Sequence, residues 1–232
     1  MKTRSFFILF FLTAVIPYIM FAQQTGNKVK KTDYSPLLKQ RVLLPFLKSG
    51  EMETWKSLKL YDGEVTSIVR DPENCNIAYA GTRDAGVFKT TDGGLTWSPA
   101  RNGLTFAPIR ELSIDTEDPA RIYAGTDYDG IWMTDDSCKT WHQTDYEGDM
   151  ITFHIIIDPS DHNTVYATEA GGIGFNVGNL YKSVNKGENW IKKGNGMMMD
   201  VDHTNGIFSF AIDPSDSKIL YAGTRSGYIH IR

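Results

Sequence analysis

The sequence has little cysteine, no extended basic segment and no Cys/His pattern of the metal-binding kind. Cys75 and Cys138 are the two cysteines among 232 residues, so a hydrophobic core rather than a disulfide framework must hold the fold together. Lys and Arg total 24 against 28 Asp and Glu, and the basic residues cluster only in the short stretch Lys28–Lys31. Because phosphate recognition needs clustered cations, this composition argues against nucleic acid as a partner.

Several motifs of enzyme chemistry are absent as well. The chain has no nucleophile elbow and no phosphate-binding loop. Asp200–Asn205 carries oxygen donors at a spacing like that of a calcium loop, but no bidentate glutamate follows at the required position. We therefore expect no metal site and no cofactor.

One long apolar run occurs, at the N-terminus. Phe6–Phe21 is almost wholly apolar, follows two basic residues and ends just before Ala22, which is a suitable cleavage point. Pro17 interrupts the run, and about 16 residues is short for a membrane-spanning helix. Residues 1–22 are thus predicted to be a signal peptide rather than a membrane anchor. The protein is then expected to be secreted or periplasmic, with no membrane span after cleavage.

The remaining chain divides into a leader and a repeat region. Residues 23–50 are predicted to form a linker with a short apolar segment, and residues 51–232 carry internal repeats. The motif Tyr-Ala-Gly-Thr, or a close variant, recurs at steps of 44, 43 and 55 residues. Its four copies begin at Tyr79, Tyr123, Tyr166 and Tyr221. An Asp-Pro pair precedes each copy, and a tryptophan follows the first three.

Each repeat contains four short segments rich in β-branched and aromatic residues, which we label strands a to d. Four strands per repeat of this length are typical of a propeller blade, whereas a β-sandwich does not need such regular repetition. The predicted fold is therefore an all-β propeller of about four four-stranded blades. The blades are predicted at residues 64–102, 109–146, 151–194 and 206–232, the last completed by 53–60.

Ring closure is predicted from Trp55, because the segment around it resembles the start of a strand d without a complete blade before it. Pairing of this N-terminal strand with the last blade would close the ring and leave no free sheet edge. The alternative is a truncated chain or an open arc, whose exposed edges would pair two chains into a homodimer.

The hairpin between strands c and d carries a recognisable motif. Thr91–Trp97 resembles the Asp-box pattern Ser/Thr-x-Asp-x-Gly-x-Thr-Trp. The second hairpin has Ser137 or Cys138 in place of the glycine, and the third has Asn185 in place of the aspartate. Such residues stabilise their own turn, so we interpret them as structural. They are Asp92, Gly94, Trp97, Asp136, Trp141, Asn185, Gly187 and Trp190.

On these motifs the chain resembles the Asp-box (BNR-type) propellers over about residues 50–232. That family includes sortilin-like receptors, xyloglucan-hydrolysing glycosidases, sialidases and a photosystem II assembly factor. Because these activities differ so widely, the resemblance implies a fold and not one function.

A binding face is predicted where the irregular loops gather. The b–c and d–a connections lie at one end of every blade, and Glu169–Asn179 and Gly194–Gly206 lengthen two of them. The residues expected to present this face are Phe106, Tyr128, Tyr146, Phe175, Met198 and His203. Cys75 and Cys138 are expected at the opposite end, in adjacent blades, which permits a disulfide between them.

The resemblance to xyloglucan-hydrolysing enzymes implies an acidic residue in a loop after strand b. The candidates are Asp84, Asp127 and Asp129, but no pair of carboxylates can be assigned from the sequence. Our leading hypothesis is an exported, non-catalytic binding or scaffold propeller that recognises a protein or a carbohydrate. The alternatives are a glycoside hydrolase of the Asp-box propeller type, or a fragment of one.

Overall fold

The computed structural model describes residues 60, 63–105, 108–148, 151–170, 179–193, 206–224 and 227–231. The chain divides into two units, Met1–Pro45 and Phe46–Arg232, and every described residue belongs to the second. These residues form strands and turns without a helix, and they contain no helix long and apolar enough to cross a membrane. The predicted signal peptide and linker lie outside the described residues.

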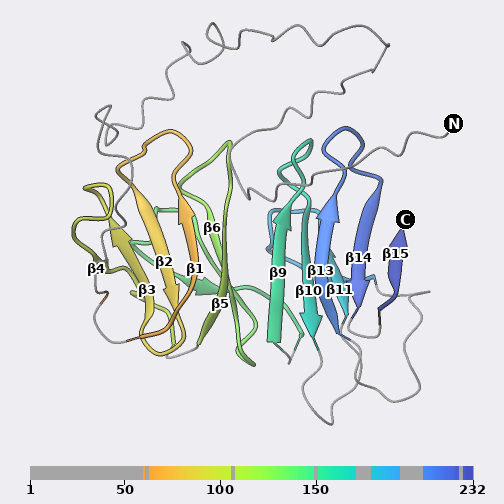
Figure 1. Ribbon diagram of the computed structural model, residues 1–232, viewed down its shortest axis with the longest axis horizontal. Coiled ribbons are helices and arrows are strands. Elements are labelled where there is room, and N and C mark those ends of the chain that lie inside the picture. Colours follow the sequence, from red (N-terminus) through yellow and green to blue (C-terminus); the bar gives the residue numbers. More distant parts are fainter. Residues whose placement is uncertain are drawn as a thin grey trace, which may run out of the picture. The chain divides into compact units, whose positions relative to one another are not determined.

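The strands form four antiparallel sheets, each built from consecutive strands in chain order (Figure 1). Blade 1 contains β1 (Val65–Arg70), β2 (Ala78–Thr82), β3 (Gly86–Thr90) and β4 (Ser98–Pro99). Blade 2 contains β5 (Ile109–Ile114), β6 (Ile122–Thr126), β7 (Ile131–Thr134) and β8 (His142–Gln143). Blade 3 contains β9 (Ile151–Ile157), β10 (Val165–Ala170), β11 (Leu180–Ser183) and β12 (Ile191–Lys192). Blade 4 contains β13 (Ile207–Ile212), β14 (Leu220–Thr224) and β15 (Ile229–Ile231).

This arrangement confirms the prediction of an all-β propeller of about four blades. The a strands follow one another, since β5 contacts β1 and β9, and β9 contacts β13. The d strands are only two residues long where they are described, and the last blade has three described strands. Closure of the ring through Trp55 stays a prediction, because that residue lies outside the described part of the chain.

The hydrophobic core lies between the blades rather than inside any one sheet. Side chains of neighbouring blades meet in three clusters, one at each junction. Tyr79 of blade 1 packs with Trp132 of blade 2, and Tyr123 of blade 2 packs with Ile155 of blade 3. A β-sheet has two faces, so a four-stranded blade buries its apolar residues only when a neighbour covers them. The repetition along the sequence is therefore needed for stability.

Hydrogen bonds join the blades at the same junctions. The Tyr123 hydroxyl is buried and donates to the carbonyl oxygen of Lys186, in the hairpin of the next blade, at 2.8 Å. In the opposite direction, Trp141 Nε1 donates to Ala100 O at 2.8 Å and Trp190 Nε1 donates to Thr144 Oγ1 at 3.2 Å. The second and third hairpins thus donate hydrogen bonds to the preceding blade, and the third also accepts one from it.

The Asp-box hairpins share one set of internal hydrogen bonds. In the first, Asp92 accepts from the amide and the hydroxyl of Thr96, at 2.9 and 2.6 Å. These bonds, with a further one from Thr90, lower the pKa of Asp92 to about 2. In the third hairpin Asn185 Oδ1 accepts from the Asn189 amide at 3.0 Å, so the amide side chain reproduces the contact to the backbone.

The second hairpin follows the same plan without a glycine. Asp136 accepts from the Thr140 amide and hydroxyl at 2.9 and 2.6 Å, and these bonds outweigh burial, which raises its pKa, to hold the pKa of Asp136 at about 2. Cys138 occupies the position of Gly94, with a φ of 67° against 94°. Ser137 precedes it, also at positive φ, 61°. Both strained residues are tolerated because the hairpin bonds and the neighbouring blade fix the backbone.

The turns between strands a and b are capped by aspartates, with one departure from the predicted pattern. Asp71, Asp158 and Asp213 each accept from the amide two residues later and donate their own amide across the turn. In blade 2 the residue that makes these contacts is Asp115, and the Asp118-Pro119 pair lies three residues beyond it. Asp115 also has the spacing of the other three aspartates, eight residues before the repeat tyrosine, so Asp118-Pro119 is not the equivalent pair.

Cys75 is half-buried, Cys138 is buried, and both are free thiols, so the disulfide considered from the sequence is not formed in this structure. Burial raises the pKa of the Cys138 thiol. Its side chain packs in the core between blades 1 and 2, where it fills space as a small apolar group.

A histidine links the a strands of three blades. His154 on β9 donates from Nε2 to Phe208 O on β13 at 2.9 Å, and its Nδ1 lies 3.3 Å from Glu111 Oε2 on β5. The hydrogen bond with Glu111 raises the pKa of His154, burial opposes the rise, and the Phe208 carbonyl adds to it. The imidazole of His154 therefore connects blades 2, 3 and 4.

Gly125→Ala is expected to destabilise the protein by about 1–3 kcal/mol. A Cβ at this position of β6 would lie 2.7 Å from Thr152 Cγ2 and 3.0 Å from Thr152 Cβ in the next blade. Urea unfolding followed by tryptophan fluorescence measures the loss. Gly223→Ala is the control at the same repeat position, because its Cβ would meet no atom closer than 3.4 Å. Equal losses in the two variants would contradict this account of blade packing.

Stability is expected to fall as the pH rises through the raised pKa of His154. The contribution of protonated His154 is complete below the unfolded-state pKa of about 6.5 and is lost as the pH passes the folded-state value. The change should be about 1 kcal/mol or less, because the pair is partly exposed. Urea unfolding between about pH 5.5 and 8.5 measures it. His154→Gln should flatten this pH dependence, and an unchanged slope would rule out His154 as its source.

Candidate functional site

The b–c and d–a connections lie at one end of the sheets, which we call the b–c face. The hairpins and the aspartate turns lie at the other end, because successive strands are antiparallel. Asp84, Asp127, Tyr128 and Asp129 belong to the b–c face, in connections directly after strand b. Phe106, Phe175, Met198 and His203, which were predicted to present this face, lie outside the described residues.

Asp127 is held in a bidentate ion pair across its own sheet. Arg110, on the a strand β5, donates from Nε to Oδ1 at 2.6 Å and from Nη2 to Oδ2 at 3.2 Å. The guanidinium carbon lies 5.7 Å from the centre of the Phe153 ring on β9. Phe208 of β13 continues this row, with its ring centre 4.8 Å from that of Phe153. The a strands of blades 2 to 4 therefore carry a connected row of Arg110, Phe153 and Phe208, and Asp127 joins this row through its ion pair.

Asp129 is held by hydrogen bonds to one of its carboxylate oxygens. Its Oδ2 accepts from the Thr105 hydroxyl and from Trp132 Nε1, the latter at 3.1 Å. Gln143 Nε2 donates to its backbone oxygen at 3.0 Å. Tyr128 lies between the two aspartates at a φ of 66°, and 60% of the residue is exposed. The turn thus presents one aromatic side chain to solvent while fixing the carboxylates that flank it.

Two predicted residues are placed differently from these. Asp84 is exposed in its turn, and no hydrogen bond or ion pair of its side chain is found among the described residues. Tyr146 is only 7% exposed, because its ring packs against Tyr181 and Trp190 at the junction of blades 2 and 3. Burial, and then the neighbouring Glu169 carboxylate, raise the pKa of Tyr146. Tyr146 therefore does not present its ring to solvent on the b–c face.

Glu169 was not among the predicted site residues, although it departs from the repeat. Thr82 and Thr126 occupy its position in blades 1 and 2, each donating its hydroxyl to the carbonyl that closes the b–c turn at 2.8 Å. Glu169 is 1% exposed, and its Oε2 accepts from Asn179 Nδ2 at 3.0 Å. Its Oε1 is buried and meets the geometry of a hydrogen bond with none of the described residues, and the same holds for Tyr146 Oη and Thr152 Oγ1. The break in the Tyr-Ala-Gly-Thr motif was the signal available in the sequence.

The geometry supports recognition more readily than acid–base chemistry. Both oxygens of Asp127 and one of Asp129 are already occupied by donors from the protein. Such fixed carboxylates, with the exposed Tyr128 ring, can accept hydrogen bonds from a ligand and pack against it. Within the described ranges, no three His, Cys, Asp or Glu side chains are grouped so as to hold a metal ion.

Sequence comparison finds one kind of relative for part of the chain. Xyloglucanase Xgh74A from Acetivibrio thermocellus is 34% identical over 122 residues, which are 46% of this chain and 14% of the xyloglucanase. The chain thus spans less than two thirds of the length of the curated relatives it matches. No profile of a known protein family matches it.

Comparison of structures extends the similarity to about three quarters of the chain. An ancestral GH74 enzyme superimposes with a TM-score of 0.63 at 20% identity, over 73% of this chain and 22% of that one. The GH74 xyloglucanase of Xanthomonas campestris gives 0.59 at 18% identity, over 73% and 28%. YCF48 from Cyanidioschyzon merolae gives 0.51 at 15% identity, over 77% and 59%. The chain therefore has a β-propeller fold, which it shares with the GH74 xyloglucanases and YCF48.

Proposed function

We propose that the chain is an exported, non-catalytic propeller that binds a glycan on its b–c face. The export rests on the predicted signal peptide, and the choice of a glycan rests on the similarity to xyloglucanases. The observation that carries the proposal is the turn Asp127–Asp129. It combines an exposed aromatic ring with two carboxylates that are held in place by donors from the protein.

A polysaccharide suits such a surface because its sugar rings have apolar faces and a rim of hydroxyl groups. The Tyr128 ring supplies a flat surface for packing, and the carboxylates accept hydrogen bonds from hydroxyls. A general acid would need a carboxyl oxygen free to pass its proton to the leaving group. Both Asp127 oxygens already accept from Arg110, which favours an acceptor role for Asp127, and each oxygen keeps a lone pair that a sugar hydroxyl can use.

A glycoside hydrolase is the second candidate, and Glu169 is the observation in its favour. Glycosidases use two carboxyl groups, one of which is often buried. Glu169 is buried with one oxygen that meets the geometry of a hydrogen bond with none of the described residues, and Asp84 is exposed without a partner among them. This candidate places catalysis at residues different from those that the sequence indicated for binding.

Xyloglucan should bind the purified full-length chain without being cleaved. Retardation in affinity electrophoresis measures binding, and an assay of reducing ends measures cleavage. Tyr128→Ala should weaken binding about fivefold to tenfold, because it removes the exposed aromatic surface. Leu95→Ala, an exposed apolar residue in the first hairpin at the opposite end, is the control and should bind as the wild type does.

Two outcomes would speak against this proposal. Equal binding by Tyr128→Ala and wild type would remove Tyr128 from the site. Release of reducing sugar that disappears in Glu169→Gln or Asp84→Asn would replace the binding protein by the hydrolase.

A further inference from the structure

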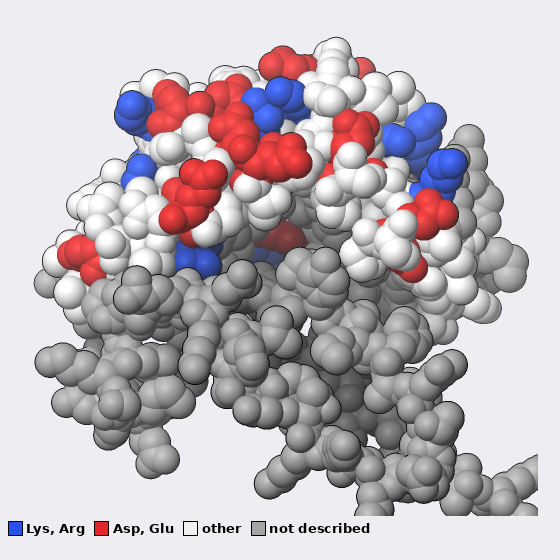
Figure 2. All heavy atoms as spheres, turned by 90° about the horizontal axis from the view of Figure 1, so that it is seen from above, with Lys and Arg blue, Asp and Glu red and all other residues white. Residues whose placement is uncertain are grey.

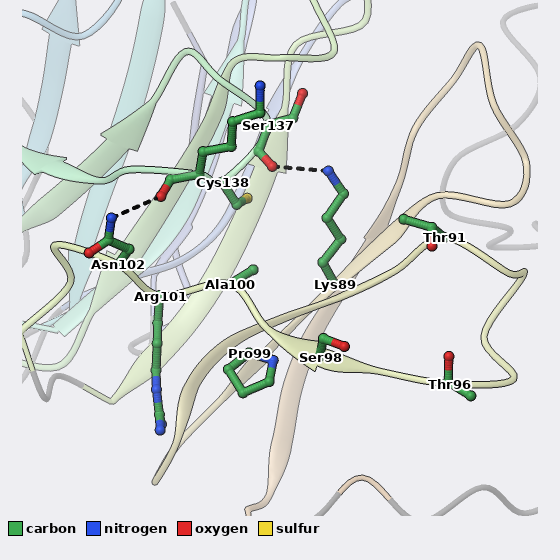
Figure 3. A pocket seen from close by; sticks show the side chains of 11 residues that line it. Lys89, Thr91, Thr96, Ser98, Pro99, Ala100, Arg101, Asn102, Ser137 and Cys138 are labelled. Carbon is green, nitrogen blue, oxygen red and sulfur yellow. Dashed lines mark hydrogen bonds between the residues drawn. The ribbon is translucent and has the colours of Figure 1, made fainter.

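A groove of about 440 Å³ lies between blades 1 and 2, and the Asp127–Asp129 turn is not part of its lining. Its volume is within the range of small-ligand sites. One wall is formed by β4 and the Ala100–Asn102 segment of blade 1, and the other by Ser137–Lys139 of the second hairpin. In Figure 3 the lining residues extend from Thr96 at one end to Asn102 at the other. An extended ligand would suit this shape better than a compact one.

The lining of this groove is cationic. Lys89, Arg101 and Lys139 contribute to it, and the described residues that line it include no Asp or Glu. The chain as a whole has a net charge of −4, and Asp and Glu cover more of the face seen in Figure 2 than Lys and Arg do. The positive groove therefore contrasts with an otherwise acidic molecule.

Hydrogen bonds hold two of these cations in place. Lys89 Nζ donates to Ser137 O at 3.1 Å and lies 5.2 Å from the centre of the Tyr79 ring. Arg101 Nη1 donates to Ala85 O at 2.6 Å. An ammonium has three donors and a guanidinium five, so both groups keep donors for a ligand. Their fixed positions reduce the entropy that binding would cost.

The next junction shows that the repeat does not require these cations. Strand pairing, the backbone bonds at the start of the d–a connections and the hairpin bonds fix the corresponding positions at the junction of blades 2 and 3. At that junction Met133 occupies the position of Lys89, Asp145 that of Arg101, and Glu188 that of Lys139. Equivalent positions thus carry neutral and acidic side chains in the same scaffold. The positive charge is a property of this one groove.

We propose that this groove binds an acidic glycan, a sugar chain that carries carboxylate groups. The cations that line the groove would pair with carboxylates of the sugar chain through charge-assisted hydrogen bonds. The hydroxyls of Thr91 and Ser98 line the same groove and can bond the hydroxyl groups of sugars, whereas the Thr96 hydroxyl already donates to Asp92. An acidic peptide would meet the charges but would leave these hydroxyls unused.

Isothermal titration of the full-length chain with tetragalacturonate tests this inference. The wild type should bind, with an affinity that falls as salt is added. Arg101→Gln combined with Lys139→Gln should weaken binding about tenfold or more, and both side chains are exposed, so the fold should be retained. Lys218→Gln removes an exposed cation elsewhere and should leave binding unchanged.

A further variant distinguishes binding in this groove from binding at the Asp127–Asp129 turn. Tyr128→Ala should bind tetragalacturonate as the wild type does, whatever its effect on xyloglucan. The inference is overturned if tetragalacturonate does not bind, or if Lys218→Gln loses as much affinity as the double variant. Poly-glutamate that binds as tightly, and loses affinity in the double variant, would make an acidic peptide the ligand instead.

Discussion

The fold depends on contacts between neighbouring blades, and the contact of strand b in blade 2 with the hairpin of blade 3 shows how they work. Tyr123 is fully buried, and its hydroxyl meets the Lys186 carbonyl of the next blade. This one side chain supplies apolar area and satisfies a backbone acceptor at the same time. A blade that lost its neighbour would expose the ring and leave the carbonyl unpaired. Each blade therefore needs a neighbouring repeat to bury its apolar side chains.

The hairpin must offer its carbonyl at a fixed place, which explains how its sequence can vary. The second hairpin replaces the glycine by Cys138, and the third has Lys186 at a φ of 59°. Cys138 departs from the motif at a residue whose side chain is not used in the hairpin bonds, and Lys186 stands where the motif admits any residue. The acceptor role is retained, since Asn185 accepts from the Asn189 amide as Asp92 does from that of Thr96. A carbonyl-type oxygen is thus the conserved requirement within this chain, and the negative charge is not.

Much of this architecture could be predicted from the sequence because the signals are local. The strands depend on a short pattern that recurs four times, and the hairpins on one that recurs three times. Asp115 was missed because its neighbour Asp118 carries the proline that marked the other turns. The burial of Tyr146 and the pairing of Asp127 with Arg110 depend on contacts between strands, which no spacing in the sequence reveals. Glu169 could have been found by asking which repeat breaks the threonine pattern, since a buried carboxyl at a hydroxyl position is chemically different.

The placement of Cys138 has a consequence for the chemistry of its sulfur. Oxidation and disulfide exchange proceed through the thiolate, and they need an approaching reagent. Burial beneath the blade junction disfavours the thiolate and blocks that approach. In an oxidising compartment this unpaired thiol would remain reduced for as long as blades 1 and 2 stay together. The rate at which a thiol reagent labels Cys138 would then measure how often blades 1 and 2 separate.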